Sequence, residues 1–104
     1  MRGEESAIYF QATGTAVATS ATATRIGTVN TLTYITDVSA SSDVGSAVVQ
    51  LRDDTAAIWQ HTVGATAPLS VQFKSPITVD GTATLYIVGA SASLKTVNFQ
   101  GYII

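Results

Sequence analysis

The chain has 104 residues and no cysteine, which indicates one domain without a disulfide framework, a thiolate metal site or a cysteine nucleophile. Only 12% of its residues are charged and the formal net charge is -2, so a basic face for nucleic acid is not expected. No apolar run reaches the length of a signal peptide or a membrane span. We therefore expect a soluble, unprocessed chain that binds neither nucleic acid nor a membrane.

The N-terminal quarter of the chain alternates alanine with threonine. Residues 7–10 and 15–26 are predicted to be strands, because interleaved threonines lose rotamer freedom in a helix and suit a pleated surface. Residues 1–12 are expected to form an N-terminal arm or a first strand, and residues 13–104 the β-sandwich domain. Residues 28–37 are predicted to be the next strand, with Leu32 and Tyr34 on one face. A loop rich in serine and aspartate is expected to follow over residues 38–45.

The middle of the chain predicts a hairpin and then a long strand. Residues 47–52 and 57–63 are expected to pair through a turn at Asp53, Asp54 and Thr55. From Leu69 to Val79 apolar and polar residues alternate, which indicates one long strand bent at Ser75-Pro76, or two short collinear strands.

The C-terminal part predicts a meander of three strands. Asp80-Gly81 favours a tight hairpin turn, because both residue types tolerate a positive φ. Residues 82–88 are the next predicted strand, residues 89–93 the following turn, and the last strand begins near Lys95. In that last strand the alternation places Asn98, Gln100 and Tyr102 outward.

The tally is about eight short strands with turns roughly every ten residues, which predicts an all-β fold, a β-sandwich. Eight strands suit a jelly roll, and an immunoglobulin-like sandwich is the alternative. The expected core consists of Leu32, Val49, Leu51, Trp59, Leu69, Val71, Phe73, Leu85, Ile87, Val97 and Phe99.

Groups that could carry chemistry are few and scattered. His61 is the single histidine, and neither a nucleophile motif nor an orienting carboxylate accompanies it, so we expect a structural or surface role. Asp53 and Asp54 lack the ligand spacing of a calcium loop and suit a turn. The glycines stand singly, so no phosphate-binding loop is expected. We predict no enzyme activity, no catalytic or metal-binding residue and no cofactor.

The aromatic residues are the candidate contact groups. Trp59 is central in its strand and is expected in the core. Tyr86 and Tyr102 are out of phase with the inward apolar residues of their strands, so they could lie where a partner chain or a sugar covers them. The predicted interaction residues are Tyr9, Phe10, Tyr86 and Tyr102.

Residues 28–104 resemble a family of small tailed-phage virion proteins. The resemblance is carried by three stretches: Val48 to Trp59, with its Leu-Arg-Asp turn and Ile-Trp strand; Phe73 to Ile87, with Pro-Ile-Thr-Val and Asp-Gly; and the closing Val97 to Tyr102. Members of this kind are jelly-roll capsid decoration (cement) proteins or head and tail appendages.

The resemblance implies a non-enzymatic virion structural protein that decorates the capsid exterior after synthesis in the host cytoplasm. Its expected partners are further copies of itself, as a trimer, and the phage major capsid protein. The low charge and the mean hydropathy of +0.32 favour such a covered surface. The alternative is a carbohydrate-binding β-sandwich, such as a lectin or the adhesin of a fibre tip.

Overall fold

The structure is a computed structural model and describes residues 8–27, 31–64 and 68–103. These residues are almost entirely extended, and none of them is helical, so no membrane-spanning helix occurs among them. The expected all-β class is confirmed. The strands are β1 (Ile8–Arg25), β2 (Thr33–Ser42), β3 (Ala47–Asp53), β4 (Ala56–Val63), β5 (Leu69–Val79) and β6 (Ala83–Ile103).

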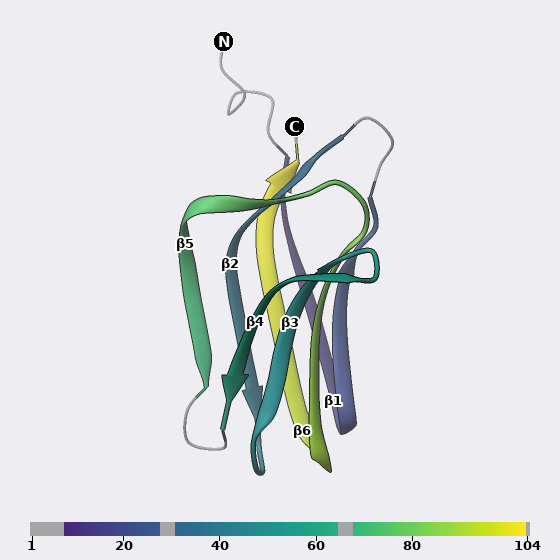
Figure 1. Cartoon of the computed structure of the whole chain (residues 1–104), viewed down its shortest axis with the longest axis vertical. Helices are drawn as coiled ribbons and strands as arrows, with labels where there is room; N and C mark the ends of the chain where they lie inside the picture. The colour runs from purple at the N-terminus through teal and green to yellow at the C-terminus, as the bar shows by residue number, and fades with distance from the viewer. Residues whose placement is uncertain (1–7, 28–30, 65–67, 104) are drawn as a thin grey trace.

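The long strands β1 and β6 are antiparallel partners that fold back together (Figure 1). The first arm of β1, residues 8–18, pairs with the second arm of β6, residues 93–103. The second arm of β1, residues 20–25, pairs with the first arm of β6, residues 83–88. Between the arms Thr19 alone stands opposite residues 89–92, and such a bulge bends both strands.

The remaining strands extend the sheet from one side of β6, in the order β4-β3-β6-β2-β5. β2 pairs with the second arm of β6 and carries β5 on its outer side. These three segments and the first arm of β1 make up the "β2 half" of the sheet. β3 pairs with the first arm of β6 and carries β4, which makes the "β3 half". The sheet curls until it is nearly closed into a barrel, and the gap lies between the edge strands β4 and β5.

The hydrophobic core lies between the two halves and draws side chains from all six strands. Most of the expected core is confirmed: Val49, Leu51, Leu69, Leu85, Ile87, Val97 and Phe99 are buried. Trp59, Val71 and Phe73 are partly buried and pack against that core. The prediction for Leu32 is wrong, because its side chain is 38% exposed.

Leu32 lies just before β2, where the inward positions are the odd-numbered ones. Thr33 and Ile35 are the buried residues at the start of this strand, whereas Tyr34 points outward. The pairing of β2 with both neighbours shifts at Thr36, so the inward positions change from odd to even numbers and continue with Val38. The face predicted for Leu32 and Tyr34 is therefore the outward one, although the same parity points inward from Val38 onward. The loop predicted over residues 38–45 is also too long, since β2 continues to Ser42.

About eight short strands were expected, and the described residues form six longer ones. Within the described residues, the stretches predicted separately over 7–10 and 15–26 fall in one strand, as do the predicted strands over 82–88 and from Lys95. The predicted break over residues 11–14 is continuously paired with β6, and the predicted turn over residues 89–93 is a bulge, so neither ends its strand. Residues 8–12 lie in β1, and residues 1–7 lie outside the described residues.

The hairpin between β3 and β4 is confirmed, but the C-terminal meander is wrong. β5 pairs with β2 and not with β6, so the Asp80-Gly81 turn connects the two halves of the sheet. This turn is docked on the β3–β4 turn: the Asp53 carboxylate accepts hydrogen bonds from the Asp80 and Gly81 amides at 3.1 and 2.9 Å. Asp54 accepts one from the Thr82 amide at 3.0 Å.

Two close approaches fix the curl of the sheet. Gly14, in the first arm of β1, lies so near the second arm that a Cβ there would overlap the carbonyl oxygen of Thr22. At the folded-back end Lys95 is fully buried, and its ammonium donates to the Ala18 carbonyl at 2.9 Å and to Ser93 Oγ at 3.0 Å. The bond to the Ala18 carbonyl ties β6 to β1 at the bend, and Ser93 supplies a second acceptor that a buried amine needs.

Candidate functional site

The outer face of the β2 half carries like side chains in rows that cross its strands. The tyrosine row consists of Tyr9, Tyr102, Tyr34 and Thr78, one residue from each of β1, β6, β2 and β5. The rings of Tyr34 and Tyr102 stack with centroids 5.0 Å apart and planes 18° apart. Tyr9 leans on Tyr102 at 5.6 Å with a tilt of 55°, and 68% of its surface is exposed. The row is thus a packed aromatic surface whose last ring, Tyr34, adjoins the small Thr78.

Two polar rows follow the tyrosine row along the same strands. The amide row consists of Gln11, Gln100, Asp37 and Gln72, and the hydroxyl row of Thr13, Asn98, Ser39 and Ser70. Within them the Gln100 amide donates to Asp37 Oδ2 at 2.7 Å, and the Asn98 amide donates to Thr13 Oγ1 at 2.8 Å. These cross-strand bonds hold the side chains in fixed positions, which reduces the entropy that a ligand would have to remove.

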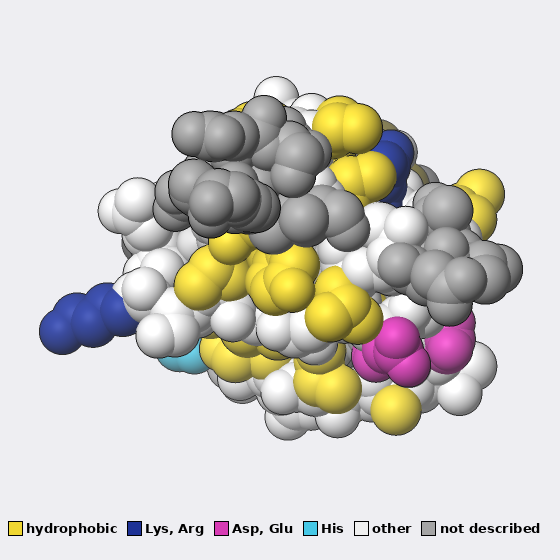
Figure 2. Space-filling model, turned by 90° about the horizontal axis from the view of Figure 1, so that it is seen from above, with side chains coloured by type: hydrophobic (Ala, Val, Ile, Leu, Met, Phe, Trp, Pro, Cys, Tyr) yellow, Lys and Arg dark blue, Asp and Glu magenta, His cyan; other side chains and the backbone are white. Residues whose placement is uncertain are grey.

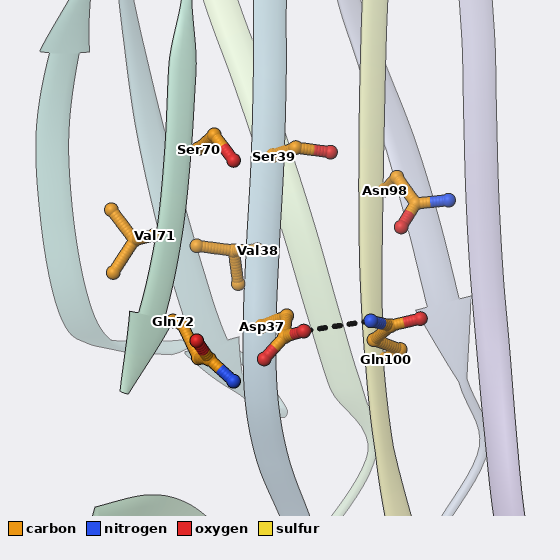
Figure 3. Close-up of a pocket in the computed structure, with 8 residues that line it drawn as sticks. All are labelled: Asp37, Val38, Ser39, Ser70, Val71, Gln72, Asn98 and Gln100. Atoms are coloured by element: carbon orange, nitrogen blue, oxygen red, sulfur yellow. Dashed lines mark hydrogen bonds between the residues drawn. The ribbon is translucent and has the colours of Figure 1, made fainter. Parts of the chain in front are cut away.

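A groove of about 470 Å³ runs between the polar rows (Figure 3). Asp37 and Gln100 face each other across two strands, and Asn98, Ser39 and Ser70 form the next level of the groove. Small-ligand sites usually enclose about 300 to 1,000 Å³, so the volume fits one ligand of modest size. The lining offers amides, hydroxyls and a carboxylate, so the groove can both donate and accept hydrogen bonds.

The predicted interaction residues fall in three different places. Tyr9 and Tyr102 lie together in the tyrosine row. Tyr86 lies on the β3 half, where the Arg52 guanidinium sits 4.4 Å from its ring centroid, so the structure does not bring it to Tyr102. Phe10 turns inward and packs edge-on against Phe99 at 5.9 Å, which makes it part of the core packing.

The groups considered for catalysis or metal binding have structural contacts. His61 is exposed on the edge strand β4 and stacks on Trp59, with ring centroids 6.1 Å apart. The carboxylates of Asp53 and Asp54 bind backbone amides, as described above. Within the described residues, no three His, Cys, Asp or Glu side chains are close enough together to hold a metal ion.

Tyr34, Asp37 and Gln100 are among the members of this face that sequence reasoning did not select. Gln100 was expected to point outward, but its neighbour Asp37 is 63 residues away in the chain. Only the register between β2 and β6 brings them together, and the bulge at Thr36 sets that register. The sequence could have indicated this face only through Tyr34, if its side chain had been assigned to the outward side of its strand.

On the end of the molecule where β1 begins and β6 ends, hydrophobic side chains gather beside a small acidic group (Figure 2). The turns that follow β3 and β5 meet where the Asp80 amide donates to the Asp53 carboxylate. The tyrosine row lies near the same end, because it joins residues close to the start of β1 and the finish of β6.

No protein-family model matches the chain, and no curated protein matches it. The resemblance to tailed-phage virion proteins therefore stays a prediction, as do the function and partners that it implies.

Proposed function

We propose that this chain is a non-enzymatic structural protein of a phage particle, which decorates the capsid exterior as a homo-oligomer, a trimer, bound to the major capsid protein. The resemblance of residues 28–104 suggests this class. The observation that supports it is an apolar patch at the folded-back end of the sheet. There Val17 and Leu94 are cross-strand partners beside the bend, and they are 75% and 44% exposed.

The patch continues onto the neighbouring loop. The Asp43 amide donates to the Leu94 carbonyl at 2.9 Å, which holds the 43–46 loop against β6. Val44 in this loop is also exposed. We name Val17, Val44 and Leu94 together the "bend patch". Covering apolar surface stabilises a contact by about 25 cal/mol per Å², so this patch favours association with another chain.

The arrangement of the strands also supports the finer jelly-roll interpretation. If the two arms of β1 and the two arms of β6 are counted separately, these four segments and the strands β2, β3, β4 and β5 make eight segments. β2 and β3 pair with the second and the first arm of β6, and β5 and β4 pair in turn with β2 and β3. The pairs β2 with β3 and β5 with β4 therefore follow the two arms of β6 across the sheet. A ribbon of long strands folded across its middle is the plan of a jelly roll, a common fold of capsid proteins.

Self-association is tested by analytical ultracentrifugation of the purified chain. We expect an oligomer at tens of micromolar, and a shift toward monomer in the double variant Val17→Ser, Leu94→Ser. Val88→Ser is the matched control, because Val88 is another exposed valine on β6 that lies outside the bend patch. A monomeric wild-type chain, or equal dissociation by the control, would contradict the oligomer.

Capsid binding is tested on particles of the phage whose genome carries the gene. Mass spectrometry of purified virions should detect the chain in many copies, and the purified chain should rebind heads from which it has been stripped. Its absence from virions together with no binding to heads would refute the decoration role, whatever the oligomeric state.

A further inference from the structure

A second region of the molecule has the chemistry of a ligand site. It lies on the same arms of β1 and β6 as the bend patch, and the Thr15–Thr96 pair separates it from Val17 and Leu94. The tyrosine, amide and hydroxyl rows cover the outer face of the β2 half, and polar side chains prevail in them. Neighbouring strands lie about 4.8 Å apart, so a ligand that crosses the strands meets a new side chain at each step. The rows therefore form a continuous array, in which aromatic rings adjoin fixed hydrogen-bonding groups.

Pyranose sugars match this combination. A pyranose ring has an apolar face of C–H groups, which packs on aromatic rings, and a rim of hydroxyls, each of which can donate and accept. Gln100 and Asn98 each offer an amide oxygen beside an amide nitrogen, and Asp37 adds a carboxylate acceptor. Gln100 and Asp37 are already bonded to each other at 2.7 Å, so a sugar would meet a preorganised pair.

The charges of this face favour a neutral ligand. Asp37 is the charged member of the three rows, and Lys74 is the next polar residue after Gln72 in the alternation of β5. One negative and one positive group leave the face without a strong field. A nucleic acid would require a cluster of basic groups to bind its phosphates, and an acidic polysaccharide would require a similar cluster of basic groups.

From the tyrosine row, the bonded Gln100–Asp37 pair and the groove of about 470 Å³ beside it, we infer that the outer face of the β2 half binds a neutral polysaccharide. Sugar rings occupy the groove along the amide and hydroxyl rows, and a further ring packs against Tyr34 over Thr78. Because a sheet face is open on both sides, a polysaccharide can lie across it, so internal segments of the polymer are bound as well as its ends.

The test is affinity electrophoresis of the full chain in gels that contain dextran, mannan, galactan or xylan, with polygalacturonate as the acidic polymer. We expect at least one neutral polymer to retard the wild-type chain. Tyr34→Ala and Gln100→Ala should each weaken that binding about threefold to tenfold, the size expected for one aromatic contact or one hydrogen bond.

Tyr86→Ala is the matched control, because it removes an outward tyrosine of β6 on the other half of the sheet. It should retain wild-type retardation, and thermal melting should show that all variants are folded. The inference is overturned if no neutral polymer retards the wild-type chain, if retardation occurs with polygalacturonate alone, or if Tyr86→Ala weakens binding as much as Tyr34→Ala. The oligomer test changes Val17 and Leu94 of the bend patch and none of the residues varied here, so failure of one proposal is distinguishable from failure of the other.

Discussion

Asp53 joins two turns that are 27 residues apart in the chain. Its carboxylate accepts hydrogen bonds from the Asp80 and Gly81 amides, and the neighbouring Asp54 adopts a positive φ of 56° while it binds the Thr82 amide. The two adjacent aspartates are thus explained by backbone recognition. This contact also determines the topology, because it docks the turn after β5 on the β3–β4 turn, so that β6 begins beside β3.

The substitution Asp53→Ala should lower the free energy of unfolding by about 1 to 3 kcal/mol, because it leaves two amides without their charged acceptor. Asp53→Asn, which keeps one acceptor oxygen, should cost less. Asp43→Ala is the control: this aspartate is exposed in a loop, and its loss should change stability by no more than about 0.5 kcal/mol. Urea denaturation measures all three, and an unchanged midpoint for Asp53→Ala would show that the turns do not depend on this bond.

Among the strands, β4 and β5 are the ones whose outer edges face the gap in the barrel. Side chains close this gap, since Trp59 of β4 meets Phe73 of β5 edge-on with ring centroids 5.6 Å apart. Edge strands tend to pair with other chains unless something discourages it, and β5 carries Lys74 and Pro76 at its exposed positions. The barrel is therefore closed by an aromatic contact between the edges of β4 and β5, which do not share backbone hydrogen bonds.

Phe73→Ala should destabilise the fold by about 1 to 3 kcal/mol, less than a fully buried phenylalanine, because Phe73 is only partly buried. It should also shift the fluorescence of Trp59 to longer wavelength, since the single tryptophan loses its ring neighbour and gains water. Ile58→Ala, on the same edge strand but 42% exposed, is the comparison and should change neither property strongly. Equal effects of the two substitutions would disprove the closure by Trp59 and Phe73.

The sequence predicts those features of the strands that depend only on residues close together in the chain. The alternation from Leu69 to Val79 and the inward positions Val97 and Phe99 follow from a period of two, and the structure confirms them. The bulge at Thr36 and the fold-back opposite Thr19 depend on pairing with strands far away in the chain, so no local pattern reveals them. The same reason explains why Tyr102 was correctly placed outward but its partner Tyr34 was not selected.

Across the whole molecule, the two ends of the chain meet as neighbours inside the sheet. The pairing begins with Ile8 opposite Ile103 and continues through Ala12 opposite Phe99. Sheet closure therefore needs residues from both ends, and a fold dominated by such distant pairs forms slowly and as one cooperative unit. The candidate sugar face has the same dependence, because its tyrosine row takes Tyr9 from the first strand and Tyr102 from the last.

Deletion of residues 1–12 should therefore impair the domain itself rather than remove a separate arm. The deletion takes away the pairs of residues 8–12 with β6, together with the packing of Phe10 on Phe99. We expect a loss of at least about 3 kcal/mol, because the lost strand pairing adds to the truncation of a partly buried phenylalanine, and a clearly lower melting temperature by circular dichroism. Deletion of residues 1–7 is the control, since it removes none of these pairs and should leave the melting temperature close to that of the full chain. If the longer deletion melts like the shorter one, the first five residues of β1 are not part of the cooperative fold.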